Sequence, residues 1–133
     1  MYTHEWTVRF SDCDPFGIAH YPRIVDAVHE VADRFMESIG FSFGTLAQEH
    51  DCGFPLIEID LQFREKLQVD DVVTVGLCTE LGNSSVRFVY EAHRGDTLAF
   101  EGFEQRACVS TEDGDAFPIP DDIREGLASA ACE

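Results

Sequence analysis

The sequence has little positive charge. It contains 9 lysine and arginine residues, of which Lys66 is the only lysine, against 26 acidic residues, and its formal net charge is −17. Such a chain would be repelled by a phosphate backbone, which excludes a nucleic-acid-binding protein. No apolar run approaches the roughly 20 residues of a membrane-spanning helix. The first six residues lack the basic and apolar regions of a secretory signal, so we expect a cytoplasmic protein with no membrane partner.

Cysteine is sparse and irregularly spaced. The five cysteines are Cys13, Cys52, Cys78, Cys108 and Cys132. Their odd number and wide scatter argue against a disulfide framework, and no CxxC pair suggests a zinc site. We therefore expect buried or idle thiols.

The acidic residues are spread along the whole chain instead of forming a tail. This distribution resembles that of proteins from salt-accumulating halophiles. In molar salt the Debye length falls to about 3 Å, which screens the repulsion among the carboxylates. An ordinary acidic protein is the alternative interpretation.

A single domain spanning residues 1–133 is expected from the length. Trp6, Val8 and Phe10 alternate with polar residues, which predicts a first strand. Apolar residues then recur at three- and four-residue steps from Pro22 onward, which predicts a long helix that Gly40 ends. Residues 41–54 show no period and are interpreted as a loop with one short helical turn at 45–49.

Four further strands are predicted after Pro55, because apolar and polar residues alternate over 57–63, 73–77, 86–92 and 97–110. The apolar parity of the last strand changes near Gly102, which indicates a bulge. A short helix is expected over 120–128. This order predicts an α+β domain with a five-stranded antiparallel sheet wrapped around one long central helix.

An acidic turn stands directly ahead of the predicted helix: residues 12–22 read Asp-Cys-Asp-Pro-Phe-Gly-Ile-Ala-His-Tyr-Pro. A helix start leaves backbone N–H groups unpaired and carries positive partial charge. A carbonyl held there would be polarised while a nearby carboxylate attacks it. The segment therefore supplies half of an acyl-transfer site, although Asp14 could instead only cap the turn.

The pattern Asp-Cys-Asp-Pro-x-Gly-Ile followed by Tyr-Pro resembles the signature of the 4-hydroxybenzoyl-CoA thioesterase family, whose members have the hot-dog fold. Weaker matches are Gly53-x-Pro55, the turn 70–72 and Ser85. The resemblance implies an acyl-CoA thioesterase that cleaves an aromatic or fatty acyl-CoA without cofactor or metal. It also implies a homodimer, or a tetramer made of two dimers, with active sites between subunits.

Two catalytic residues are implied by this resemblance. Asp14 matches the reactive carboxylate, acting as nucleophile or as general base toward water. Tyr21 matches the position whose backbone N–H polarises the substrate carbonyl. Cys13 is a rival nucleophile, and Asp12, Asp14 and His20 could on paper form a metal site.

Substrate contacts are expected from six further residues. They are Phe16, Gly17, His20, Phe54, Ile57 and Ser85. Core packing or loop geometry would explain most of these residues equally well. The chain departs from a well-known aromatic-thioester member of the family before Ser85, because Gly82-Asn83-Ser84 carries no positive charge for the CoA phosphates. Arg64, Arg87, Arg94 and Arg106 remain as possible phosphate partners.

Two other functions remain open. A non-catalytic hot-dog module would bind acyl thioesters or an acyl carrier protein without turnover. A hydroxyacyl-thioester dehydratase would need an acid–histidine pair, for which only His20 or His29 is available.

Overall fold

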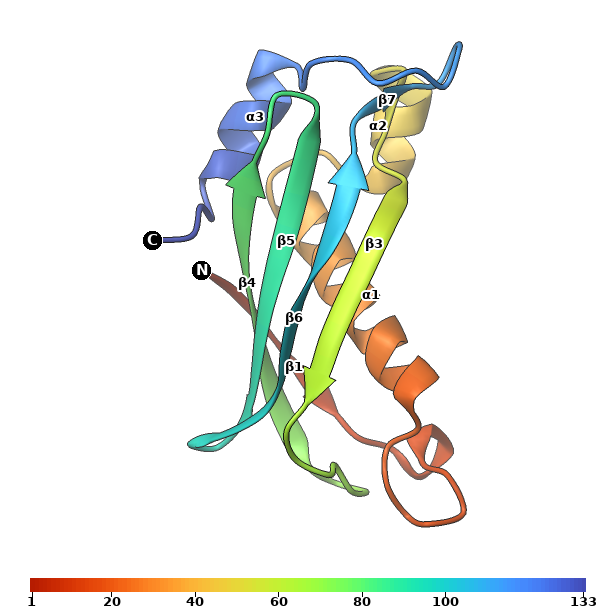
Figure 1. Ribbon diagram of the computed structural model, residues 1–133, viewed down its shortest axis with the longest axis vertical. Helices are drawn as coiled ribbons and strands as arrows, with labels where there is room; N and C mark the ends of the chain where they lie inside the picture. The colour runs from red at the N-terminus through yellow and green to blue at the C-terminus, as the bar shows by residue number, and fades with distance from the viewer.

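The computed structural model describes residues Met1–Glu133, and Figure 1 shows one sheet with a long helix lying across one of its faces. The elements in chain order are β1 (Tyr2–Thr7), the 3-10 turn η1 (Phe10–Asp12), α1 (Tyr21–Ser38), α2 (Phe43–Glu49), β2 (Cys52–Gly53), β3 (Leu56–Phe63), β4 (Val72–Leu81), β5 (Ser85–Arg94), β6 (Thr97–Ala107), β7 (Val109–Ser110) and α3 (Asp121–Ala128).

The main sheet has five antiparallel strands in the order β1-β4-β5-β6-β3, so β1 and β3 form its edges. The prediction of an α+β domain with an antiparallel sheet against a long helix is confirmed. The structure adds the short helix α2 and a two-stranded ribbon of β2 and β7. None of the α-helices combines the length and apolar character needed to cross a bilayer.

Helix α1 has the predicted apolar stripe. Its buried residues are Ile24, Ala27, Val28, Val31, Ala32, Phe35 and Met36. Gly40 follows the helix with φ +87°, and the Phe41 N–H donates to the Met36 carbonyl, 3.0 Å away, across it. Glycine adopts this left-handed conformation without steric cost, which explains why the helix ends here. The stripe packs the helix onto the sheet and so places its first turn beside the acidic loop.

The first strand begins earlier than the alternation predicts, and Phe10 lies outside it. Phe10 is 85% exposed in the turn η1. The Arg9 N–H donates to Asp12 Oδ2 at 2.8 Å, and this local hydrogen bond turns the chain before the strand can continue. Asp12 therefore has a structural role in the turn.

The bulge predicted near Gly102 does not fall at that residue, although β6 has a register irregularity at Ala99. Gly102 pairs regularly with Leu61 and Tyr90, while the register shifts lie between Leu56 and Glu58 and between Ala92 and His93. The shift beside Ala92 skips Ala99 of β6, and from Phe100 to Arg106 the strand keeps one parity. Glu104 and Arg106 are buried on its inner side, and Phe103 is only half-buried. The prediction failed because it treated charged residues as outward-facing.

The expectation that all cysteines are idle thiols is also wrong. Cys78 on β4 and Cys132 form a disulfide, and Cys13, Cys52 and Cys108 are free. The chain after α3 returns to β4, where the Thr79 N–H donates to the Ala130 carbonyl at 2.9 Å. Tertiary packing brings these two cysteines together across 54 residues, which their spacing alone does not indicate.

Candidate active site

The acidic loop is closed by its own hydrogen bonds, with Asp14 at its centre. Asp14 Oδ1 accepts from the Phe16 N–H at 2.9 Å and from the Ile18 N–H at 3.4 Å. The Gly17 N–H donates to the Asp14 carbonyl at 2.9 Å, and Gly17 has φ +80°, a conformation that favours glycine. These contacts orient the carboxylate through one oxygen. The other oxygen, Oδ2, accepts no hydrogen bond within the chain.

The start of α1 presents an unused donor beside this loop. His20 is the N-cap, with extended backbone, and its side chain makes no capping hydrogen bond. The N–H of Tyr21 donates to no group of the chain, and Pro22 has no N–H. The N-terminal end of an 18-residue helix carries positive partial charge. An oxygen placed at Tyr21 N would therefore gain a free hydrogen bond and a favourable dipole.

Asp14 and Tyr21 line the same cavity, whose volume is about 490 Å³. Its lining residues are Asp14, Ile18, Ala19, His20, Tyr21, Ile24, Phe63, Arg64, Glu65, Lys66 and Leu67. Ile24 and Leu67 are buried and form apolar wall. This cavity has the size expected of a small-molecule site, apolar with a few polar groups. It combines a carboxylate, a free helix-start N–H and apolar walls, as an acyl-transfer site requires.

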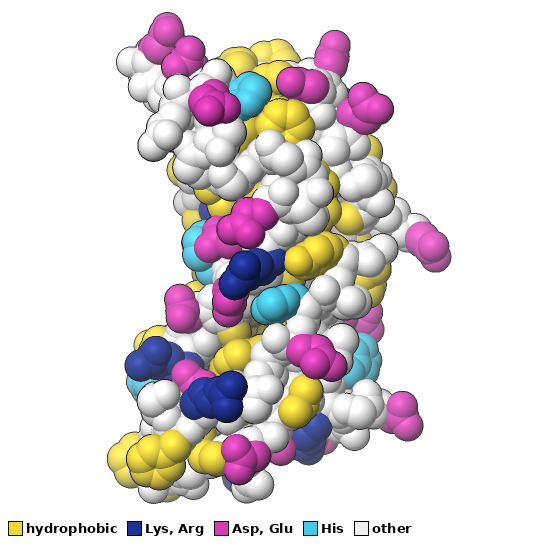
Figure 2. Space-filling model, turned by 180° about the vertical axis from the view of Figure 1, so that it is seen from behind, with side chains coloured by type: hydrophobic (Ala, Val, Ile, Leu, Met, Phe, Trp, Pro, Cys, Tyr) yellow, Lys and Arg dark blue, Asp and Glu magenta, His cyan; other side chains and the backbone are white.

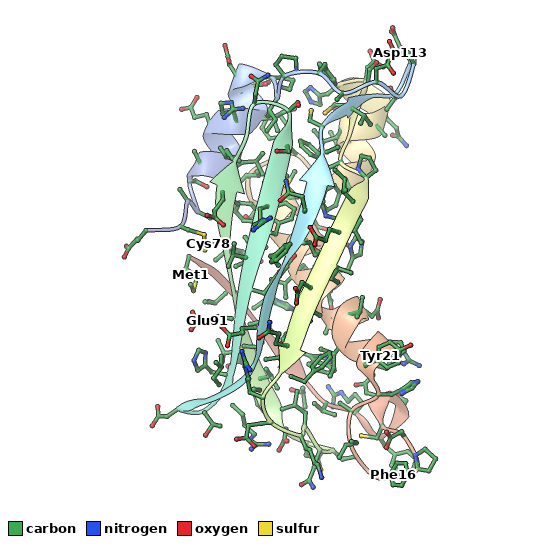
Figure 3. All side chains as sticks on the ribbon, viewed as in Figure 1. Met1, Phe16, Tyr21, Cys78, Glu91 and Asp113 are labelled. Atoms are coloured by element: carbon green, nitrogen blue, oxygen red, sulfur yellow. A yellow bond between two sulfur atoms is a disulfide. The ribbon has the colours of Figure 1, made fainter.

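Only some of the site residues predicted in the acidic loop line the cavity. His20 and Tyr21 line the cavity, and their rings contact each other edge-on at 5.3 Å. Phe16 is 88% exposed at the tip of the loop and does not line it. Figure 3 shows Phe16 and Tyr21 at the same end of the molecule, and Asp113 at the opposite end.

Phe54, Ile57 and Ser85 lie far from the cavity in this chain. Phe54 is buried and Ile57 is 63% exposed near the Leu56 end of β3, whereas Phe63 at the other end of β3 lines the cavity. Ser85 begins β5 and lines a separate shallow hollow of about 250 Å³ with Arg87 and Gln105. One chain therefore brings Asp14, His20 and Tyr21 together but leaves the other three residues at the far end of β3.

The edge strand β3 exposes apolar side chains that alternate along its length. Those that are more than one third exposed are Leu56, Ile57, Ile59 and Phe63, and the last three share one parity. The strand pairs only with β6, so its outer hydrogen-bonding edge is unpaired. Natural proteins rarely leave a long apolar edge uncovered. The edge of β3 is therefore a surface that a further strand would cover.

A buried polar network lies on the inner face of β5 and β6. The Tyr90 O–H donates to Glu104 Oε1 at 2.6 Å, and Arg106 Nη2 donates to Glu104 Oε2 at 3.3 Å. Arg106 Nη1 donates to the Phe54 carbonyl at 3.0 Å, and Nη2 lies 3.1 Å from His29 Nδ1. Sequence reasoning missed this network, because two charged residues on alternate positions of a strand normally indicate its solvent face.

Burial, together with the neighbouring Glu104 carboxylate, raises the pKa of Tyr90 well above 10. The phenol therefore stays neutral and keeps donating to Glu104. Nε of Arg106 is buried without a partner. Neither Glu104 nor Arg106 lines the Asp14 cavity.

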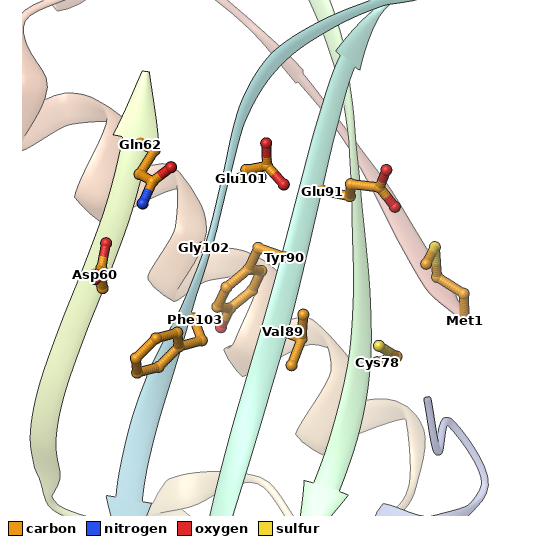
Figure 4. Close-up of a pocket in the computed structure, with 10 residues that line it drawn as sticks. All are labelled: Met1, Asp60, Gln62, Cys78, Val89, Tyr90, Glu91, Glu101, Gly102 and Phe103. Carbon is orange, nitrogen blue, oxygen red and sulfur yellow. The ribbon is translucent and has the colours of Figure 1, made fainter. Parts of the chain in front are cut away.

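A second hollow, of about 370 Å³, lies on the outer face of the sheet (Figure 4). Asp60, Glu91 and Glu101 surround it, and Gly102 lies in its floor, where a Cβ atom would collide with the backbone of Asp60. It contains none of the predicted site residues.

Rival chemistries receive little support from the geometry. Burial and the carboxylates of Asp12 and Asp14 raise the pKa of the Cys13 thiol, which disfavours a nucleophilic thiolate. No group of three or more potential ligands is arranged to hold a metal ion. His29 contacts Arg106 and does not line the Asp14 cavity.

The sheet, the helix and the carboxylate cavity together define a domain built for acyl-transfer chemistry. A family model described as the thioesterase-like superfamily matches residues 8–127. The chain therefore belongs to the thioesterase-like superfamily, which confirms the prediction of a thioester hydrolase.

Relatives of known name agree with this assignment. The 1,4-dihydroxy-2-naphthoyl-CoA hydrolase of Nostoc punctiforme is 20% identical over 127 residues, covering 95% of this chain and 86% of that protein. The structure of the gentisyl-coenzyme A thioesterase BH1999 superposes with a TM-score of 0.83 at 26% identity, covering 95% of this chain and 99% of that chain. SAV2348 of Staphylococcus aureus, solved in complex with CoA, shares the fold. Its TM-score is 0.89 at 18% identity, covering 99% of this chain and 86% of that chain.

Proposed function

We propose that the protein is a cytoplasmic acyl-CoA thioesterase of the 4-hydroxybenzoyl-CoA thioesterase type, which hydrolyses an aromatic acyl-CoA. One observation carries the proposal: Asp14 and the free N–H of Tyr21 share one cavity with apolar walls. The naphthoyl and gentisyl groups in the names of two relatives are aromatic, which favours an aromatic over a fatty acyl group.

In the proposed reaction the thioester oxygen accepts a hydrogen bond from Tyr21 N, and Asp14 acts on the carbonyl carbon. Asp14 either attacks directly, forming an acyl-enzyme that water hydrolyses, or removes a proton from attacking water. Charge that develops on the carbonyl oxygen is stabilised by the helix start. The products are a free acid and the CoA thiol, and no step requires a metal or cofactor.

Asp14→Asn tests the role of the carboxylate. Asparagine keeps an Oδ1 acceptor for the Phe16 and Ile18 N–H groups, so the loop should retain its conformation, but the negative charge is lost. We expect kcat for thiol release from aromatic acyl-CoAs to fall by about 10² to 10⁴-fold. Asp26→Asn, at an exposed position of α1, is the control and should keep wild-type activity. Full activity of Asp14→Asn would refute the mechanism.

The role of the Tyr21 N–H is separable from that of the ring. Tyr21→Ala removes the ring and keeps the N–H, whereas Tyr21→Pro removes both. Proline is tolerated at the first helical position, and His20 already has the extended backbone that proline requires before it. We expect Tyr21→Pro to lose a further factor of about 10² to 10³ in kcat relative to Tyr21→Ala. Equal rates in the two variants would contradict the proposed oxyanion contact.

We further propose a homodimer formed through the unpaired edge of β3. Antiparallel pairing of two β3 strands about a two-fold axis would place the Leu56 end of the partner strand beside the Phe63 end of the first. Phe54, Ile57 and Ser85 of the second copy would then approach the Asp14 cavity of the first, which accounts for their separation within one chain. The apolar side chains on the edge would also become covered.

Ile59→Glu tests this interface, because it places a charge in the middle of the proposed strand pair. We expect the wild type to sediment as a dimer or tetramer and the variant to sediment as a less active monomer. Ala128→Glu adds the same charge to an exposed position of α3 and should leave the assembly unchanged. A monomeric wild type with full activity would exclude the interface.

The same assays separate the other functions. Calorimetric binding of an acyl-CoA without thiol release would indicate a non-catalytic module. An enoyl product without thiol release would indicate a dehydratase.

A further inference from the structure

Two of the few cations of this acidic chain lie beside the Asp14 cavity. Arg64 and Lys66 line it, on the segment that leaves β3. Lys66 makes no ion pair within the chain, so its ammonium group is free to bind a ligand. Arg64 pairs with Glu101 at 3.2 Å through Nε. In Figure 2, which views the helix side of the molecule, most of the visible Lys and Arg side chains lie in its lower half, where α1 begins.

The segment that carries these cations is fixed to the acidic loop. The Ala19 N–H donates to the Leu67 carbonyl at 2.7 Å, and Leu67 is buried. Arg94 Nη1 donates to the Lys66 carbonyl at 3.0 Å and to Asp71 Oδ2 at 3.0 Å. The backbone of Lys66 is therefore fixed relative to the acidic loop.

This placement is informative because Arg64 and Lys66 offset the carboxylates of Asp14 and Glu65, which line the same cavity, whereas the molecule as a whole is strongly acidic. With a net charge of −17, a polyanionic ligand approaches favourably only where cations gather locally. The segment Gly82-Asn83-Ser84 before Ser85 has no cation. The one arginine in the hollow beside Ser85 is Arg87, which donates to Gln105 at 2.9 Å and shares that hollow with Glu80.

We propose that Lys66, assisted by Arg64, binds the phosphate groups of the CoA carrier at the mouth of the Asp14 cavity. This inference rests on the proposed thioesterase function, and it replaces the position before Ser85 as the nucleotide anchor. The ammonium and guanidinium groups bind phosphate through charge-assisted hydrogen bonds. CoA is the carrier that fits, since its compact phosphates can meet these two cations alone, whereas the larger face of an acidic carrier protein would also meet the surrounding carboxylates.

The test compares thioesters of one aromatic acid on two carriers, CoA and pantetheine, of which pantetheine has no phosphate. For Lys66→Ala we expect the ratio of kcat/KM for the CoA thioester to that for the pantetheine thioester to fall about tenfold. The change should lie in KM and not in kcat. Arg34→Ala, which removes an exposed cation on α1 that pairs with Glu30 and Glu37, is the charge control. Arg87→Ala tests the alternative anchor beside Ser85, and both control variants should keep the wild-type ratio.

Equilibrium binding of CoA itself provides a readout that does not depend on hydrolysis. Lys66→Ala should weaken CoA binding about tenfold and lower the dependence of affinity on KCl concentration, since one phosphate contact is lost. If the wild-type protein hydrolyses neither thioester, the proposed function is refuted, and the binding measurement still decides whether Lys66 binds CoA. An unchanged carrier ratio and unchanged CoA affinity in Lys66→Ala would overturn this inference, and so would the same loss for both carriers.

Discussion

The ion pair of Glu104 and Arg106 offers the sharpest test of the packing described above. Both side chains are at most 8% exposed, and each leaves a buried charge if the other is removed. Glu104→Gln keeps an acceptor for the Tyr90 O–H but removes the charge facing Arg106. We expect a loss of about 3–5 kcal/mol in the free energy of unfolding, and a similar loss for Arg106→Met.

The double variant Glu104→Leu/Arg106→Met should behave differently from the sum of the single variants. It removes both charges and also the buried, unpartnered Nε of Arg106. Replacing a buried ion pair by apolar residues is often neutral or stabilising by about 1–4 kcal/mol. Because the Tyr90 O–H and the Phe54 carbonyl then lose their partners, we expect the double variant to be at least as stable as either single variant but less stable than the wild type.

Urea unfolding in a buffer with molar KCl measures all three variants. Arg64→Met is the control, because its pair with Glu101 is 49% and 40% exposed and should contribute less than about 1 kcal/mol. A loss below 1 kcal/mol for Glu104→Gln would refute the account of a buried, desolvated pair. A double variant that loses the sum of the two single losses would also refute it.

Three further predictions concern stability. Cys132→Ser removes the disulfide to Cys78, which spans 54 residues, and should lower the free energy of unfolding by up to about 4 kcal/mol. Urea unfolding without reductant measures this, and an unchanged free energy would exclude a structural role for the disulfide. Burial raises the pKa of Cys52 to about 12 and also raises that of Tyr90, so both groups ionise first in the unfolded chain. The melting temperature should therefore be level near neutral pH and fall above about pH 9, less steeply in Cys52→Ala. Increasing KCl from 0.1 to 2 M should screen the repulsion among the carboxylates and raise the melting temperature, by about 4 °C for each kcal/mol of repulsion removed. A constant or falling melting temperature would argue against halophilic adaptation.

Local patterns predicted most of the secondary structure, because each depends on neighbours a few residues apart. The stripe from Ile24 to Phe35 identified α1, and Gly40 identified its end. The alternation around Ile59 and Phe88 identified β3 and β5. The strand β6 was misinterpreted, since the burial of Glu104 and Arg106 depends on partners that come from α1, β5 and the segment before β3.

The candidate site also has a part that the sequence predicted and a part that depends on tertiary contacts. Asp14 and Tyr21 are seven positions apart on one loop and helix start, so their proximity was visible in the sequence. The wall formed by Arg64 and Lys66 was not predicted, because it reaches the loop only through the pairing of Ala19 with Leu67. From the sequence, Arg64 was only one of four arginines considered as phosphate partners, and Lys66 stood out only as the single lysine.

The sequence by itself determined the helix, the alternating strands and the acidic turn at the helix start, since short-range periodicity and backbone chemistry specify these features. Only the tertiary structure decided which charges are buried, which cysteines are bonded and which cations lie beside Asp14. Each of these depends on contacts between residues far apart in the chain, whose closeness arises only when the sheet closes around its core.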